Sequence, residues 1–142
     1  MKTKFKKISI IGPGLIGSSL GLAMKEARLA KEILGIDKSK ENLHHALKNG
    51  SVDHGATTID NRIKDSDIIF ICTPVSLIDE LVKKVIPFTS NNTIISDVGS
   101  VKNIFKKSTV NLVNKKCFFV PGHPIAGTEH SGAKNAENNL FK

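Results

Sequence analysis

Short apolar runs alternate with longer stretches of helical periodicity along the whole chain. The run Ile68-Ile69-Phe70-Ile71-Cys72 is continuous, which is typical of a strand buried on both faces of a parallel sheet. In the first helical stretch, apolar or small residues recur at i, i+3, i+4 and i+7 from Leu15. The pattern predicts strands at residues 7–11, 33–36, 56–58, 68–72, 93–96 and 117–120. It predicts helices at residues 15–26, 40–48, 76–86 and from 100 or 101 to 113.

This alternation of strands and helices predicts one α/β domain over residues 1–142. We expect a Rossmann-type, doubly wound and mostly parallel sheet, with helices on both faces and the strand order 3-2-1-4-5-6. Ligands of such sheets bind beyond the carboxyl ends of the strands. The residues that directly follow each strand are therefore the candidates for function.

A glycine-rich turn links the first predicted strand to the first predicted helix. The sequence from Gly12 to Gly17 matches G-x-G-x-x-G between a strand and a helix start. Gly12 permits a tight turn, Gly14 permits close approach of a pyrophosphate, and Gly17 permits close packing of the helix on the strand. The first amide groups of the helix, at Leu15 and Ile16, face the anion. The turn therefore predicts a dinucleotide site.

Asp37 stands at the end of the second predicted strand, 20 residues after Gly17 (37 − 17 = 20). A carboxylate at this position accepts hydrogen bonds from ribose hydroxyls and repels a 2′-phosphate. This favours NAD over NADP as the cofactor. Lys38 and Lys40 follow closely and could tolerate a phosphate, so NADP is the less favoured alternative.

Two further loops are expected beside the cofactor. Thr73 and Pro74 follow the fourth predicted strand, although a strand that simply ends at proline, with Ser76 capping the next helix, would show the same residues. Asp97 and Gly99 follow the fifth predicted strand, where we expect them to contribute to the same cofactor site.

Candidate catalytic groups follow the fifth and sixth predicted strands. Ser100 and Lys102 would place a hydroxyl and an ammonium group near the nicotinamide end of the cofactor. The same residues are also consistent with Ser100 as a helix cap and Lys102 as a surface lysine. His123 lies between Gly122 and Pro124, directly after the sixth predicted strand. Oxidation of an alcohol needs a base for the hydroxyl proton, and histidine suits this task near neutral pH. A structural loop histidine is the alternative.

Composition narrows the function classes. The chain has 39% hydrophobic and 24% charged residues, which is ordinary for a globular protein, and no apolar run approaches the roughly 20 residues of a membrane span. The net charge of +8 comes from scattered lysines without interleaved aromatic residues, so we expect neither nucleic-acid nor membrane partners. The basic start breaks at Gly12 without a cleavage site, which favours a cytoplasmic protein.

The two cysteines lie in predicted strands. Cys72 and Cys117 are therefore expected to be buried free thiols. No spacing of metal ligands is present in the sequence, so no metal site is expected.

Five segments of the chain form a recognisable set. They are IGPGLIGSSL, LGIDKS, ICTPV, SDVGSVK and GHPIAGTEHSG, followed by Ala133, Ala136, Leu140 and Phe141. Together they resemble the amino-terminal NAD-binding domain of the prephenate/arogenate dehydrogenase family of tyrosine biosynthesis. The resemblance implies oxidation of the cyclohexadienol of prephenate with NAD or NADP and loss of carbon dioxide to give 4-hydroxyphenylpyruvate. Arogenate would give tyrosine directly.

The resemblance also implies roles for three side chains. His123 would accept the proton of the ring hydroxyl, Ser100 would hydrogen-bond that hydroxyl or orient the histidine, and Lys102 would support the site electrostatically. Two alternatives stay open: a non-catalytic NAD-binding module, and another Rossmann hydroxyacid dehydrogenase.

The chain departs from this family at its end. Family members continue into a helical domain that forms a homodimer and supplies an arginine for the substrate carboxylate. This sequence stops at Lys142, and its arginines, Arg28 and Arg62, are not expected near His123. We therefore expect a truncated cofactor-binding domain without the helical substrate and dimerisation domain.

Overall fold

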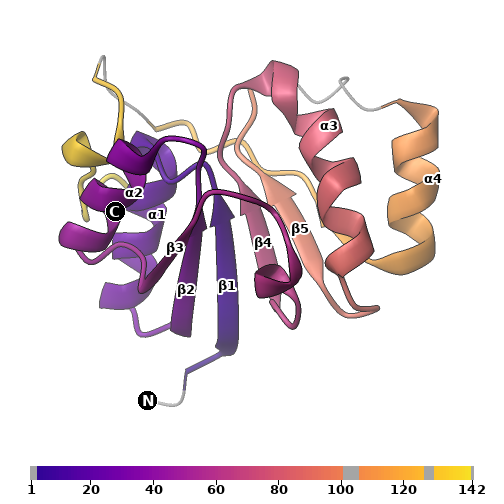
Figure 1. The fold of residues 1–142 in the computed structure, drawn as a ribbon, viewed down its shortest axis with the longest axis horizontal. Helices are drawn as coiled ribbons and strands as arrows, with labels where there is room; N and C mark the ends of the chain where they lie inside the picture. Colours follow the sequence, from indigo (N-terminus) through magenta and orange to yellow (C-terminus); the bar gives the residue numbers. More distant parts are fainter. Residues whose placement is uncertain (1–2, 101–105, 127–129, 142) are drawn as a thin grey trace.

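The computed structural model describes residues 3–100, 106–126 and 130–141. They form a six-stranded sheet with helices on both faces (Figure 1). The strands are β1 (Phe5–Ile11), β2 (Ala30–Ile36), β3 (His54–Ala56), β4 (Ile68–Ile71), β5 (Ile94–Asp97) and β6 (Phe118–Val120). The α-helices are α1 (Leu15–Glu26), α2 (Lys40–Lys48), α3 (Val75–Val85) and α4 (Lys107–Lys116). Short 3₁₀ helices are η1 (Asn61–Ile63), η2 (Ile86–Phe88) and η3 (Ala133–Asn135).

The strands pair in the order β3-β2-β1-β4-β5-β6, and every neighbouring pair is parallel. This confirms the predicted Rossmann-type sheet and its strand order. Because all strands run in one direction, their carboxyl ends meet at one edge, at the top in Figure 1. The loops that carry the candidate residues therefore share that edge.

Two apolar cores lie on opposite faces of the sheet. The core beneath α1 and α2 contains Ile8, Ile10, Met24, Ile33, Ala46, Val52 and Ala133. The core beneath α3 and α4 includes Ile11, Leu34, Ile69, Ile71, Ile78, Val82, Ile95 and Val113. Within β1, Ile8 and Ile10 belong to one core and Ile11 to the other, because successive residues of a strand point to opposite faces of the sheet. In the part of the chain that the structure describes, no helix is long and apolar enough to cross a membrane.

Several predicted boundaries shift by a few residues. The strands β1 and β2 begin earlier than predicted, and β3 occupies residues 54–56 in place of 56–58. Strand β3 ends at Ala56 because this is the last residue that pairs with β2: its carbonyl accepts a hydrogen bond from the Asp37 amide at 3.0 Å. Residues 57–59 continue over the strand ends into the site described below.

The helix predicted from residue 100 or 101 to residue 113 is contradicted at Ser100 and at Lys106, while residues 101–105 lie outside the described residues. Ser100 lies outside any helix, and Lys106 has an extended backbone (φ −69°, ψ 147°) directly before α4. The helix starts there because Asp79 of α3 accepts hydrogen bonds from the Lys106 amide (3.0 Å) and the Thr109 hydroxyl (2.7 Å) through Oδ1. A carboxylate from one helix thus caps the start of another.

This interhelical cap gives a stability prediction. Burial alone would raise the pKa of the Asp79 carboxyl, but the bonds from Lys106, Thr109 and Lys83 lower it below its ordinary 3.8. Replacement Asp79→Ala should therefore lower the free energy of unfolding at pH 7 by about 1–2 kcal/mol, measured by urea denaturation.

The adjacent Glu80 provides the control. Its carboxylate pairs with Lys84 on the exposed face of α3, so Glu80→Ala should leave the urea midpoint unchanged. The contribution of Asp79 is full above its ordinary pKa of 3.8 and is lost as the pH falls through the lower folded-state value. A difference between wild type and Asp79→Ala that grew on acidification would contradict this account.

Candidate functional site

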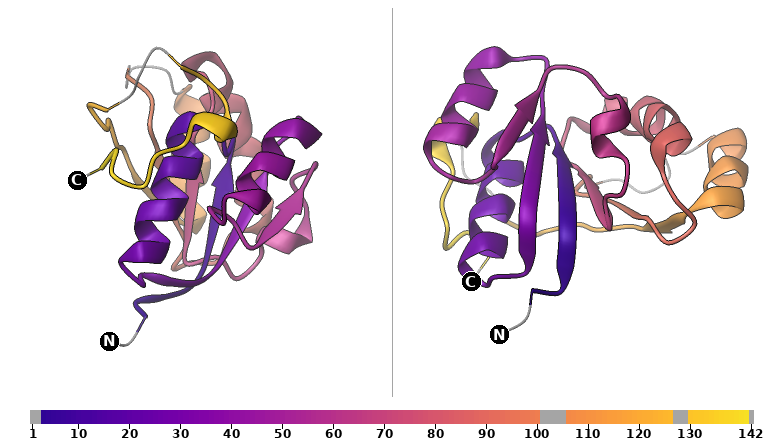
Figure 2. Two further views of the ribbon diagram at one scale, coloured as in Figure 1. Left: turned by 90° about the vertical axis from the view of Figure 1, so that its left-hand side faces the viewer. Right: turned by 60° about the horizontal axis from the view of Figure 1, so that its bottom comes forward.

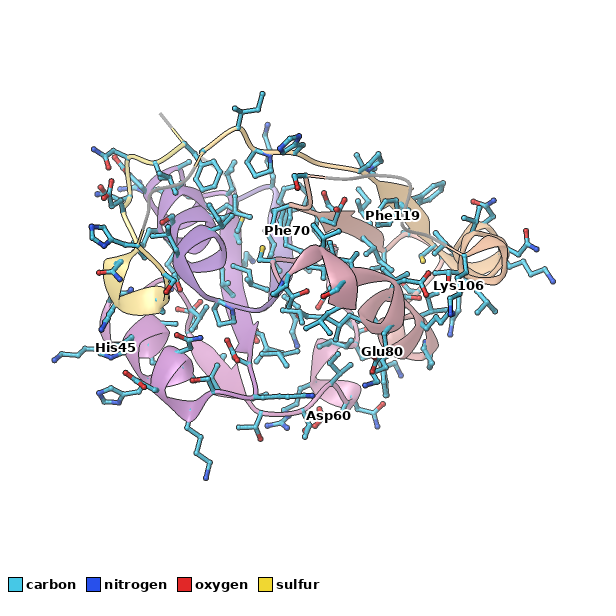
Figure 3. The ribbon with its side chains drawn as sticks, turned by 90° about the horizontal axis from the view of Figure 1, so that it is seen from above. His45, Asp60, Phe70, Glu80, Lys106 and Phe119 are labelled. Atoms are coloured by element: carbon cyan, nitrogen blue, oxygen red, sulfur yellow. The ribbon has the colours of Figure 1, made fainter. Side chains whose placement is uncertain are left out.

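A cleft of about 1310 Å³ lies along the carboxyl edge of the sheet, the edge that faces the viewer in Figure 3. It is lined by segments that follow all six strands. The predicted site residues in its lining are Gly12, Gly14, Leu15, Ile16, Asp37, Thr73, Pro74, Gly99, Ser100 and His123. Gly17 and Asp97 lie behind this lining, and Lys102 lies outside the described residues. The fold thus brings most of the predicted residues to one cavity.

The glycine turn after β1 fits tightly against its surroundings at two of its three glycines. Gly12 has φ +82°, and a Cβ there would lie 2.8 Å from the Thr73 Cγ2 and 2.9 Å from the Cys72 carbonyl oxygen. A Cβ at Gly17 would lie 2.6 Å from the Gly12 carbonyl oxygen. A side chain at either position would therefore displace backbone.

Gly14 behaves differently. Apart from its own local backbone, no atom of the described residues lies within 4 Å of the position that its Cβ would take, and its φ of −77° is not positive. Neither packing within the described chain nor a positive φ therefore requires glycine here. The space in front of Gly14 belongs to the cleft. A ligand could approach the backbone closely there only because Gly14 has no side chain.

The start of α1 presents backbone donors to the same space. The first helical hydrogen bond joins the Ser18 amide to the Gly14 carbonyl (3.0 Å), so the preceding amides have no partner within the helix. No side chain of the described residues caps this end, and no acidic residue occupies its first turn. The Ser18 hydroxyl donates to the Pro13 carbonyl (2.8 Å) and pins the turn. This end of the helix suits an anion.

Asp37 lies on the cleft wall with both carboxylate oxygens oriented by neighbours. Oδ1 accepts from the Ser39 amide (2.9 Å), and Oδ2 accepts from Asn42 Nδ2 (3.2 Å). Ser39 also caps α2, since its Oγ accepts from the Asn42 amide (3.2 Å). The start of α2 therefore fixes the Asp37 carboxylate and leaves its remaining lone pairs for a ligand in the cleft.

Thr73 places an unsatisfied hydroxyl at the cleft. Its Oγ1 is buried and has no hydrogen-bond partner among the described residues, although a buried hydroxyl without a partner is costly. Its Cγ2 packs against the position that a Gly12 Cβ would take, which fixes the side chain beside the glycine turn. An orphaned hydroxyl beside an open glycine turn fits a site completed by a polar ligand.

The neighbouring Cys72 is an unreactive thiol. Burial, and after it the charge of Asp97, raises the pKa of the Cys72 thiol to about 12, which keeps it protonated at neutral pH. Both cysteines are free thiols. Cys117 is buried, as predicted, whereas Cys72 as a whole residue is only partly buried because the cleft begins at the end of β4.

Asp97 ties two loops together from beneath. The residue is 1% exposed, and its carboxylate accepts from the amides of Gly99 (2.9 Å) and Gly122 (3.3 Å). A Cβ at Gly99 would lie 2.9 Å from Asp97 Oδ2, and one at Gly122 would lie 2.6 Å from the Asp97 carbonyl oxygen. Its carboxylate supports the cleft wall and does not line it. The loops of Ser100 and His123 are thereby fixed to each other.

Ser100 and His123 are exposed within this wall. Each follows a glycine that packs on Asp97, so both side chains lie at the end of the cleft formed by β5 and β6. A hydroxyl and an imidazole at one wall can bind and deprotonate an alcohol. Among the described residues, no group of three or more His, Cys, Asp or Glu side chains could hold a metal ion.

The sequence did not indicate every wall of the cleft. Residues missed include Asn42, Thr57, Thr58, Ile59, Glu80, Leu81, Lys84, Phe88, His130, Ser131 and Gly132. One local signal was available for Asn42, because the third residue after a serine cap lies beside that cap. Thr57, Thr58 and Ile59 follow β3, which was predicted two residues too late. The rest come from α3, η2 and residues 130–132, and no local pattern marks them.

Comparisons with known proteins agree with this geometry. The family model described as prephenate dehydrogenase, nucleotide-binding domain, matches residues 20–142. A prephenate dehydrogenase from Lactococcus lactis subsp. cremoris is 39% identical over 96% of this chain, which covers 39% of that protein. The chain therefore spans less than half the length of this relative.

Two solved structures are similar over nearly the whole chain. The prephenate dehydrogenase from A. aeolicus, in complex with hydroxyphenyl propionate and NAD+, has a TM-score of 0.88 and 30% identity. That match covers 100% of this chain and 49% of the other. The arogenate dehydrogenase from Synechocystis has a TM-score of 0.83 and 34% identity, covering 94% of this chain and 46% of the other.

The two glycines give a contrasting prediction. Gly17→Ala should lower the free energy of unfolding by about 1–3 kcal/mol because the new methyl group meets the Gly12 carbonyl. Gly14→Ala should leave it unchanged or slightly raised, since its methyl group enters open space at a permitted φ. Urea denaturation of both variants measures this, and equal losses would contradict the assignment of open space to Gly14.

Proposed function

The chain belongs to the prephenate dehydrogenase family as its nucleotide-binding domain, and we propose that its cleft binds NAD for the oxidative decarboxylation of prephenate. The observation that carries this proposal is the open space in front of Gly14, where a helix start offers backbone donors. A pyrophosphate fits such a place. The A. aeolicus relative, which is 30% identical, holds NAD+.

The other cofactor contacts follow from this placement. The Thr73 hydroxyl would gain the partner that it lacks, and the carboxylate of Asp37 would accept hydrogen bonds from the adenosine ribose. The charge of Asp37 opposes a 2′-phosphate and so favours NAD over NADP. Lys38 also lines the cleft and works in the opposite direction, which makes Asp37 the deciding group.

The catalytic step needs little more than positioning. Bound NAD supplies the hydride acceptor. An imidazole nitrogen of His123 takes the proton of the ring hydroxyl, and the Ser100 hydroxyl holds that oxygen or orients the imidazole. Release of carbon dioxide makes the ring aromatic, so the chain orients the substrate and accepts one proton. By the family resemblance, Lys102 adds favourable charge.

Substrate carboxylates need cations that the described cleft supplies only in part. Its lining contains Lys38 and Lys84 but, among the described residues, no arginine. Arg62 pairs with Asp60 at 2.6 Å, and Arg28 follows the far end of α1. Because bidentate binding of a carboxylate favours arginine, we propose that groups outside this cleft complete the substrate site. Prephenate and arogenate are both candidate substrates, and a homodimer is proposed for the longer family enzyme.

Gly14→Ala tests the cofactor site. Its methyl group occupies space that the pyrophosphate would take, so the affinity for NAD should fall at least about tenfold, which is about 1.4 kcal/mol. Calorimetric titration of NAD into wild type and variant measures this difference. Since Gly14→Ala is expected to fold normally, unchanged affinity would place the dinucleotide elsewhere.

His123→Asn separates catalysis from binding. The variant should bind NAD as tightly as wild type, but NADH formation from prephenate should fall by about 100-fold or more because the proton acceptor is lost. Calorimetric titration measures the affinity for NAD, and NADH fluorescence follows the formation of NADH. If wild type binds NAD without forming NADH, this chain by itself is a non-catalytic NAD-binding module, as a substrate site completed by groups outside the cleft would also predict. If the variant keeps its rate, His123 is not the base.

A further inference from the structure

Residues 130–137 follow β6 in the chain but lie on the opposite side of the molecule. We call residues 130–137 the strap. Its helix η3 packs against α1 and α2, far from β6 in the strand order, as Figure 2 shows. The first strap residues, His130, Ser131 and Gly132, line the cleft. The strap is therefore one wall of the proposed cofactor site.

Helices α1 and α2 hold the strap by side chains. Ala133 is fully buried in the core beneath both helices, and its carbonyl accepts from Asn49 Nδ2 at 3.1 Å. The Glu137 amide donates to the buried Ser19 hydroxyl at 2.9 Å. These contacts seat the strap, and neither of them involves the ribose-binding carboxylate.

Asn42 connects the strap to the Asp37 carboxylate. Its Oδ1 accepts from the Ala133 amide (3.4 Å), while its Nδ2 donates to Asp37 Oδ2 (3.2 Å). A Cβ at Gly132, where φ is +84°, would lie 3.4 Å from the same Asn42 oxygen. One amide group thus spans from the carboxylate on one wall of the cleft to the strap on another.

The chemistry of this bridge is directional. The Asp37 carboxylate only accepts hydrogen bonds, and the Ala133 N–H only donates one. A bridging side chain must therefore donate to the first and accept from the second, which neither a carboxylate nor an ammonium group can do. A primary amide offers a donor and an acceptor at once. Asparagine therefore matches both neighbours. Each of the two hydrogen bonds holds the Asn42 amide in the orientation that the other bond needs.

We propose that Asn42 is a positioning residue that couples the strap to the ribose-binding carboxylate. The coupling rests on the proposed NAD site. A cofactor ribose that engages Asp37 stabilises the orientation of Asn42, which stabilises the strap; a seated strap in turn holds Asp37 ready for the ribose. The cofactor thereby orders a wall that follows the His123 loop in the chain.

Two substitutions separate the halves of the bridge. Asn42→Ala removes both bonds, whereas Asn42→Asp keeps an acceptor for Ala133 but loses the donor to Asp37 and adds a repelling charge. His44→Ala, at an exposed position of the same helix, is the control. The measurements are the NAD dissociation constant by calorimetry and hydrogen exchange at the Ala133 amide by NMR, with and without saturating NAD.

In wild type and His44→Ala, NAD should slow exchange at Ala133. In Asn42→Asp and Asn42→Ala, the dissociation constant should rise about tenfold and NAD should no longer slow that exchange. If Asn42 had a merely structural role, its substitution would change the rate of hydrogen exchange at the Ala133 amide, but NAD would still slow that exchange.

Two results overturn parts of the account separately. If both variants bind NAD as wild type does, or if NAD still slows exchange at Ala133 in them, Asn42 does not couple the sites. If wild type itself does not bind NAD, the proposed function fails first.

Discussion

The close approach of α1 to the end of β1 is the constraint on which the cleft depends. Gly17 and the Gly12 carbonyl are so near that even a methyl group would displace backbone. The approach sets the start of α1 over the end of a central strand, whose neighbours β2 and β4 lead away in opposite directions. The crevice between these departing halves is where doubly wound sheets bind ligands. Without this packing, the helix donors would not face the cavity.

Polar side chains extend this arrangement to either side. Toward β6, the buried carboxylate of Asp97 fixes the backbone before Ser100 and before His123. Toward β3, Asn42 joins Asp37 to the strap. In both cases one side chain orients two segments that are distant in sequence. The cofactor end and the proposed catalytic end are thus set by different groups on one sheet edge, so substitutions at one end can be studied without dismantling the other.

The sheet could be predicted because its determinants are local. Apolar runs mark the strands, and the glycine turn with Asp37 at a spacing of 20 residues marks the first half of a Rossmann sheet. The start of α4 could not be predicted, since the group that caps it, Asp79, lies in another helix. The strap could not be predicted either, because Asn42 and Ala133 are 91 residues apart. Asp97 was expected at the cofactor, yet its burial assigns its carboxylate to the loops above it.

Asp37 is the proposed selector between NAD and NADP in this cleft. The most direct measurement is a calorimetric titration of the chain with NAD and, separately, with NADP, repeated on Asp37→Ser. Wild type should bind NAD at least about tenfold more tightly than NADP, and Asp37→Ser should remove most of this difference. Equal affinities in wild type, or a preference that survives Asp37→Ser, would show that Asp37 does not select the dinucleotide.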